Sequence, residues 1–173
     1  MPLPVVGKAH EAASRQDFVW FIYGSSLSRR AFEAWAAEHG YRVPDFSKAV
    51  PARLDGHRLA FDVMSRFWGG ATADLVPAPG RAVEGVALPL PGSARGLVDH
   101  KEGAISGLYE PFEVEVRPLP GGAPMKALAF RAAAGRRLPQ EAPPSPTFLD
   151  ALIEGGSEWK LSEGWLRELE GLR

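Results

Sequence analysis

The chain has 173 residues, and its 20 lysines and arginines against 21 aspartates and glutamates give a net charge of −1 at pH 7. Because the charges nearly cancel, the sequence predicts no basic surface for nucleic acid or an anionic membrane. No apolar run approaches the ~20 residues that are needed to cross a bilayer. The absence of cysteine excludes disulfides, thiolate metal sites and a cysteine nucleophile. We therefore expect a globular protein of the cytoplasm, without nucleic-acid or membrane partners.

The beginning of the chain differs in composition from the rest. Residues 1–16 mix prolines, small residues and charges, and the pattern then changes abruptly to apolar and aromatic. We expect an N-terminal extension over 1–16 and a single domain over 17–173, a length that buries about 70% of its unfolded surface. The 19 glycines and 16 prolines indicate many turns between short strands.

The first predicted elements are a buried strand and a helix. Residues 18–23 form an apolar and aromatic run that ends at Gly24, which is typical of a buried strand. Ser28 is a good N-cap for a helix that ends at Gly40.

Short strands are predicted next. Segments 50–54 and 58–63 flank Asp55-Gly56, a pair typical of a hairpin turn. Segments 71–76 and 82–88 are two further strands, separated by the turn-forming sequence Pro-Ala-Pro-Gly.

The second half combines strands with helices. A short helical segment over 94–101 precedes strands at 108–116 and 126–130, and Ser145-Pro146 and Ser162 begin two C-terminal helices. The chain as a whole predicts an α+β fold: a small, mostly antiparallel β-barrel of about six or seven short strands, with inserted and C-terminal helices.

Familiar catalytic motifs are missing. The sequence has no Gly-x-Ser-x-Gly elbow and no phosphate-binding Walker loop. His100-Lys101-Glu102 matches half of a zinc deaminase signature, but the other half needs cysteines. The four histidines show no spacing typical of metal ligands: His10, His39, His57 and His100. We predict neither a metal nor a cofactor.

One candidate site is the loop that follows the first strand. It contains Tyr23, Gly24, Ser25, Ser26 and Leu27. Glycine permits a sharp turn and a close approach to a ligand, and the two small hydroxyl residues leave successive N–H groups open to a carboxylate or an oxyanion. The alternative is a plain exit from the strand.

The other candidate is Glu102, at the end of the helical segment 94–101. Followed by Gly103, its carboxyl group is placed to point into the mouth of a barrel. The alternative is a solvated charge in the run that begins at Asp99.

These features occur in an order that resembles the gamma-glutamylcyclotransferases of the AIG2-like superfamily. The loop at 23–27 resembles that family's Tyr-Gly-Ser-Asn-Leu, and residues 99–103 with 106–109 resemble its Leu-Asp-x-x-Glu-Gly and Ser-Gly-x-Tyr segment. Further likeness covers its first hairpin, its next two strands and the proline-rich start of its C-terminal helices: residues 52–54, 59–61, 68–72, 79–86 and 142–148. The resemblance spans roughly residues 18–170.

The resemblance implies an enzyme that cyclises the γ-glutamyl group of a γ-glutamyl amino acid or amine to 5-oxoproline and releases the free amine, without metal or cofactor. It places the catalytic glutamate on Glu102 and the substrate loop on residues 23–27. Its chemistry needs only one carboxylate to move protons between two nitrogens. We expect partial burial to raise the pKa of Glu102 towards the working pH.

Three further positions bear on the substrate. Tyr109 either borders the ligand or packs into the barrel. Ser26 stands where the family usually has asparagine, and Phe148 where it often has a tyrosine that touches the substrate. These departures leave two alternatives open: a cyclotransferase for a specialised biosynthetic γ-glutamyl intermediate, and a non-catalytic domain of the same fold that binds a small molecule. The sequence predicts no oligomeric state.

Overall fold

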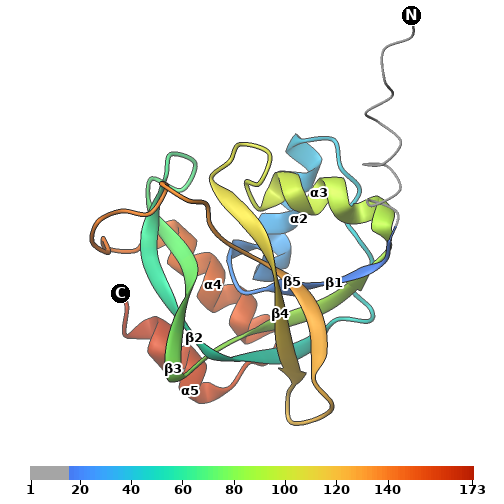
Figure 1. Ribbon diagram of the computed structural model, residues 1–173. Helices are drawn as coiled ribbons and strands as arrows, with labels where there is room; N and C mark the ends of the chain where they lie inside the picture. The colour runs from blue at the N-terminus through green and yellow to red at the C-terminus, as the bar shows by residue number, and fades with distance from the viewer. Residues whose placement is uncertain (1–15) are drawn as a thin grey trace, which may run out of the picture.

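Five strands close into a barrel in a computed structural model that describes residues 16–173 (Figure 1). Around the barrel the strands follow the order β1-β3-β2-β4-β5. Their bounds are β1 Phe18–Ile22, β2 Val50–Ser65, β3 Gly70–Leu90, β4 Tyr109–Pro118 and β5 Met125–Ala132. Paired strands are antiparallel except β1 and β5, which run parallel and meet at Trp20 and Leu128. The expected α+β barrel is confirmed. Of the expected extension at residues 1–16, residues 1–15 lie outside the part of the chain that the structure describes.

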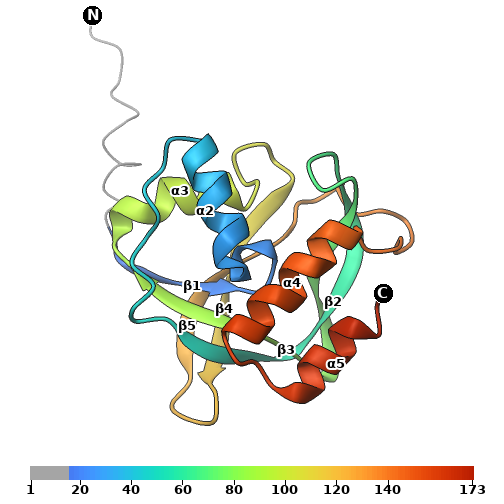
Figure 2. The same cartoon turned by 180° about the vertical axis from the view of Figure 1, so that it is seen from behind.

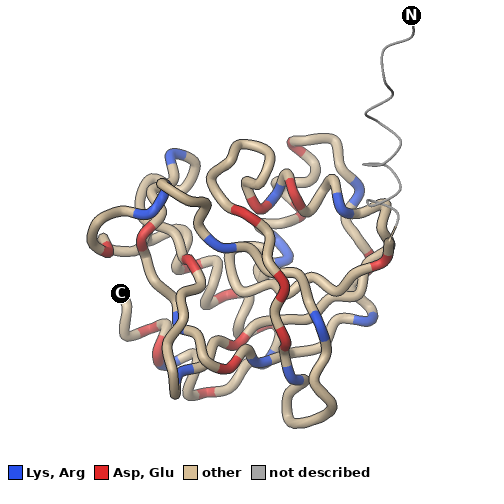
Figure 3. Tube along the Cα trace, in the orientation of Figure 1, with Lys and Arg blue, Asp and Glu red and all other residues tan. Residues whose placement is uncertain are grey.

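Helices cover one end and one side of the barrel. Figure 2 shows α4 and α5 across one side, while α2 and α3 lie together at one end. The helical elements are η1 Ser25–Leu27, α2 Arg29–Glu38, η2 Gly92–Ala94, α3 Arg95–Lys101, α4 Pro146–Glu158 and α5 Glu163–Glu170. No helix in the described range is long and apolar enough to cross a membrane. Basic and acidic residues are intermixed along the trace (Figure 3).

The predicted serine caps are confirmed. The side-chain oxygen of Ser28 accepts a hydrogen bond from the Ala31 amide at 3.1 Å, and Ser162 caps α5 through the amide of Trp165 at the same distance. Ser145 caps α4 in the same way, with Pro146 in the first turn. Each serine satisfies an N–H group that the helix itself leaves without a partner.

The predicted hairpin turn at Asp55-Gly56 is wrong. Strand β2 continues through this pair, which forms a bulge where Gly56 adopts a φ of +73° and lies opposite residues 78–81 of β3. A left-handed glycine suits a bulge as well as a tight turn, so the pair alone does not distinguish them. The strands expected at 71–76 and 82–88 are accordingly one strand, β3, and the chain reverses at residues 66–69 instead.

The strand before the candidate loop lies in the core. Trp20, Phe21 and Ile22 are each at most 1% exposed, because the helices cover one face of β1 and the barrel interior the other. Burial of both faces explains the continuous apolar run in the sequence. It also fixes the point at which residues 23–27 leave the barrel.

Candidate active site

A cavity of about 320 Å³ opens where β1 and α3 end. Its lining unites seven of the eight residues singled out in the sequence, from segments far apart in the chain: Tyr23, Gly24, Ser25, Ser26, Glu102, Tyr109 and Phe148. The eighth, Leu27, does not line the cavity and lies in the core with 1% of its surface exposed. The fold therefore brings the loop and the carboxyl group to one place.

The loop forms the single turn of η1. Its bonds run from the Leu27 amide to the Gly24 carbonyl and from the Ser28 amide to the Ser25 carbonyl, both at 3.1 Å. The amides of Ser25 and Ser26 precede these bonds, and neither has an acceptor among residues 16–173. The backbone at Gly24 is extended, with φ −108°. Because Gly24 has no side chain, it leaves room beside Phe148. Its backbone does not adopt the left-handed conformation that favours glycine.

Helix α4 holds this loop from behind. The indole N–H of Trp159 donates to the Leu27 carbonyl at 3.2 Å. Gly155 lies so close to the loop that a β-carbon there would be 2.3 Å from the Leu27 carbonyl carbon. Contacts with α4 and with Trp159 at its C-terminal end thus set the position of the bare amides.

Glu102 caps the C-terminus of α3, and its side chain faces the cavity. The side chain is only partly buried because the cavity is open, but protein surrounds it closely enough that desolvation raises its pKa to about 7. The positive charge of Lys101 and the indole of Trp20 act in the opposite direction and favour the charged form. The Trp20 indole N–H is buried close to the Glu102 carboxyl group, but it makes no hydrogen bond of ordinary geometry within the described part of the chain.

Both tyrosines of the cavity donate hydrogen bonds from their hydroxyl groups to backbone carbonyls of the barrel strands. Tyr23 donates to the carbonyl of Phe130 at 2.5 Å, and Tyr109 donates to that of Ala73 at 2.8 Å. The Tyr109 hydroxyl also lies 2.8 Å from the side-chain oxygen of Thr72. Burial raises the pKa of both phenols well above the ordinary value, so they stay neutral. Tyr109 thus borders the cavity and anchors the barrel at once.

Sequence reasoning missed several residues of the cavity. Lys101 is one of them, and its ammonium donates to the Ser25 hydroxyl at 3.3 Å. Five others carry aromatic rings: Trp35, His39, Phe67, Trp68 and His100. Trp68, His100 and Lys101 fell within the family resemblance, but nothing in the sequence shows which of these side chains turn inward.

A pair of aspartates lies in the neighbouring wall of the barrel. Asp74 is fully buried and accepts from the Ala132 amide at 2.7 Å and from the Arg137 side chain at 3.0 Å. Asp62 lies beside it, and burial together with the charge of Asp74 raises the pKa of Asp62 to about 6. Neither residue lines the cavity.

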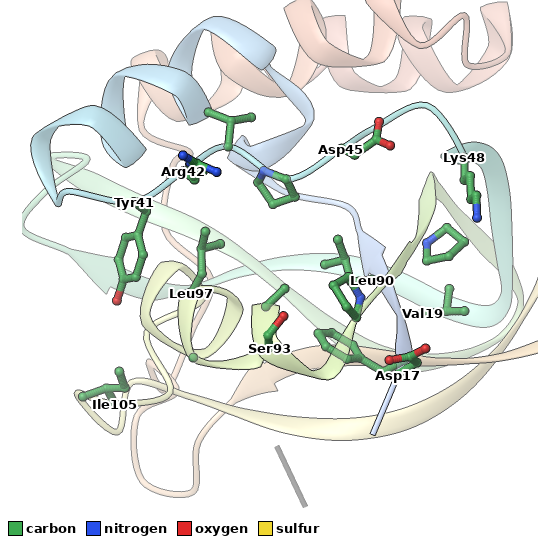
Figure 4. A pocket seen from close by; sticks show the side chains of 17 residues that line it. Asp17, Val19, Tyr41, Arg42, Asp45, Lys48, Leu90, Ser93, Leu97 and Ile105 are labelled. Atoms are coloured by element: carbon green, nitrogen blue, oxygen red, sulfur yellow. The ribbon is translucent and has the colours of Figure 1, made fainter. Parts of the chain in front are cut away.

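A larger cavity, of about 1030 Å³, lies between the start of β1, the segment after α2 and the start of α3 (Figure 4). Its walls are mostly apolar, and its carboxylates, Asp17 and Asp45, are exposed. It contains none of the residues singled out in the sequence. In the part of the chain described, no three His, Asp or Glu side chains are arranged to hold a metal ion.

Comparisons with known proteins point to one family. The model of the AIG2-like family matches residues 82–169. The chain is 27% identical over 169 residues to mouse gamma-glutamylcyclotransferase, covering 95% of this chain and 84% of the mouse protein. It is 29% identical over 147 residues to the human protein of that name, covering 83% and 72%.

The fold agrees with the sequence comparison. A solved structure named gamma-glutamyl cyclotransferase superposes with a TM-score of 0.74 at 25% identity, over 91% of this chain and 89% of that one.

Proposed function

The chain belongs to the AIG2-like family, and we propose that it is a gamma-glutamylcyclotransferase that converts γ-glutamyl compounds to 5-oxoproline and a free amine. The observation that carries the proposal is Glu102, with a pKa raised to about 7, in one cavity with the loop at residues 23–26. A carboxyl group of this pKa both accepts and returns protons near neutral pH.

In the first step Glu102 accepts a proton from the α-ammonium of the bound γ-glutamyl group. The freed amine attacks the γ-carbonyl carbon of the same molecule, and a carbon–nitrogen bond closes the five-membered ring. Both reactants are already in one molecule, so holding the reactive conformer supplies much of a proximity effect that reaches about 7–11 kcal/mol. Tyr23 and Tyr109 line the cavity and shape that conformer.

In the second step the old carbon–nitrogen bond breaks. Glu102 returns its proton to the leaving nitrogen, and the tetrahedral oxyanion collapses to the ring carbonyl. Glu102 carries two protons in turn by this route, because the attacking nitrogen loses two in all and the amine gains two and departs as an ammonium ion. Negative charge on the intermediate is stabilised by the free amides of Ser25 and Ser26, at about 3–4 kcal/mol for one such donor.

Phe148 and Ser26 make the cavity less polar than the tyrosine and asparagine of the family pattern would. Phe148 is 5% exposed and packs edge-on against Trp68, with ring centroids 5.5 Å apart. Its wall is therefore apolar where a tyrosine would present a hydroxyl. We propose that this side of the cavity favours apolar parts of the substrate.

The test is formation of 5-oxoproline, followed by mass spectrometry. Substrates are γ-glutamyl-alanine, γ-glutamyl-phenylalanine, a γ-glutamyl amine and glutathione. Glu102→Gln keeps the shape and removes the proton shuttle, so we expect activity to fall by about 10²–10⁴-fold. Glu113→Gln is the matched control, because Glu113 is an exposed carboxylate on β4 with a side chain 71% exposed.

Each outcome has a distinct meaning. Full activity in Glu102→Gln would rule out the mechanism. Binding by calorimetry without 5-oxoproline from any compound would instead indicate the non-catalytic binding domain.

A further inference from the structure

The cavity that contains Glu102 shares one wall with a second hollow. This hollow, of about 410 Å³, lies between α2, α4 and the tip of the β2–β3 hairpin. Four residues line both spaces: Trp35, Phe67, Trp68 and Lys101. We name these four residues the shared wall. A ligand that reaches past Glu102 on this side meets the shared wall.

Lys101 gives this wall a cation that forms no ion pair with the described residues, and Glu102 acts on it only at longer range. Its ammonium donates to Ser25, lies 5.5 Å from the ring centre of Trp35, and has no carboxylate within 4.0 Å among residues 16–173. Arg30, which also borders the hollow, is paired with Glu154 at 2.9 Å. A partly buried charge is costly without a partner, so Lys101 is the group in this wall that is poised for an anion.

The rest of the wall is aromatic and already fixed in place. Phe67 and Trp68 contact each other edge-on at the hairpin tip, with centroids 5.2 Å apart. The Trp68 carbonyl accepts from the Ser145 hydroxyl at 2.6 Å, and its amide donates to Ser65 at 3.2 Å. Phe67 is 67% exposed. An exposed aromatic ring on an anchored turn is a contact surface for an apolar group.

We propose that the shared wall binds the leaving group of the substrate and selects γ-glutamyl derivatives of aromatic or large apolar amino acids. Lys101 pairs with the carboxylate of the departing amino acid, and Trp35, Phe67 and Trp68 contact its side chain. This inference rests on the proposed function.

The placement of Lys101 favours the leaving group over the glutamyl head. Tyr23 and Tyr109 line only the Glu102 cavity, where the head must lie for its amine to reach the carboxyl group. Lys101 lines the second hollow as well, on the side of α2. The scissile bond lies at Glu102, so whatever is released extends from there towards Lys101.

The experiment compares two substrates that differ in one carboxylate. These are γ-glutamyl-phenylalanine and γ-glutamyl-phenethylamine, assayed by kcat/KM for 5-oxoproline. We expect the wild type to prefer the first by about 10- to 100-fold, the range of a hydrogen bond to a charged group. Assayed at a pH where Glu102 is ionised in both proteins, Lys101→Met removes the preference by lowering kcat/KM for the first more than for the second, and Lys101→Arg retains part of it. The control is Lys126→Met, an exposed lysine on β5 with a side chain 80% exposed.

Aromatic contact is tested separately. In the wild type, γ-glutamyl-phenylalanine should exceed γ-glutamyl-alanine in kcat/KM, and Phe67→Ser should reduce that ratio. An unchanged ratio in Phe67→Ser would overturn the role of the hairpin tip.

Calorimetry separates this inference from the proposed function. Binding of the same two compounds is measured in Glu102→Gln with and without Lys101→Met. Carboxylate-dependent binding that Lys101→Met abolishes supports the shared wall even if the wild type forms no 5-oxoproline, which overturns only the proposed function. Equal losses for both compounds would assign Lys101 to the glutamyl head and overturn the inference, as would equal turnover of both by the wild type.

Discussion

Gly155 of α4 packs directly on the backbone of Leu27, behind the loop of bare amides. A β-carbon at 155 would lie 2.3 Å from the Leu27 carbonyl carbon and 2.5 Å from the Ser28 nitrogen. Both contacts are with backbone, which cannot rotate away as a side chain can.

Gly155→Ala should therefore push α4 and the loop apart. We expect a loss of about 1–3 kcal/mol in the free energy of unfolding and a rise in KM, because residues 24–27 move. The measurements are urea unfolding and steady-state kinetics. Gly156→Ala is the matched control: its β-carbon would meet the mobile end of Leu166 at 3.0 Å, and alanine is about 1 kcal/mol better than glycine within a helix. Equal effects at both positions would contradict the packing argument.

The pH dependence of activity should report Glu102. In the proposed mechanism Glu102 acts as a base, so we expect kcat/KM to rise as the carboxyl group ionises, with a midpoint at about pH 7. The charge of Lys101 lowers the pKa of Glu102, so Lys101→Met should shift the midpoint to higher pH. The check is a pH–rate profile for each protein with γ-glutamyl-alanine. A midpoint that moves to lower pH in Lys101→Met would contradict the effect of the Lys101 charge on Glu102.

The Asp62–Asp74 pair predicts a pH-dependent stability. The folded pKa of Asp62, about 6, lies above its ordinary value of 3.8, so its protonated form stabilises the fold. That stabilisation is complete below about pH 4 and is lost as the pH rises through 6. Asp62→Asn should gain about 1 kcal/mol over the wild type at pH 8 and nothing at pH 4.

Urea titrations at the two pH values measure this difference. Asp150→Asn is the control, because its ion pair with Arg173 is exposed on both sides and contributes little at either pH. If Asp62→Asn were less stable than the wild type at pH 8, ionisation of Asp62 would not destabilise the fold and the prediction would be wrong.

Tyr109 should matter more for stability than for catalysis. Its hydroxyl is bonded to the Ala73 carbonyl and lies beside Thr72. Tyr109→Phe removes these bonds and should cost about 0.5–1.5 kcal/mol in unfolding free energy, with kcat within a few-fold of the wild type. A loss of kcat comparable to that of Glu102→Gln, at unchanged thermal stability, would instead place the phenol in the proton transfer.

Local features of the fold were predictable from the sequence because they depend on a few neighbouring residues. Ser28, Ser145 and Ser162 each cap a helix through an amide three residues ahead. The bulge at Gly56 was not predictable, because its left-handed backbone suits two structures, and only pairing with residues 78–81 decides between them. Long-range pairing is what local sequence does not encode.

The candidate site divides in the same way. Glu102 and the loop were found through an ordered set of motifs. Lys101 lay in the motif around Glu102 but was given no role, and Phe67 lay outside the motifs. A cavity wall is made by segments that meet only in the fold, here the end of α3 and the tip of a hairpin. In the sequence, the charged run around Lys101 resembles a solvated surface. Only the structure shows that Lys101 borders a cavity and forms no ion pair with the described residues.

Trp20 contributes both to the closure of the barrel and to the pKa of Glu102. It lies at the single register pair between β1 and β5, and its indole also favours the ionised form of Glu102. Parting these two strands would admit solvent beside the carboxyl group and cancel the desolvation that raises its pKa towards neutral pH. The proton transfer proposed for Glu102 would therefore depend on the short pairing of β1 with β5 staying closed.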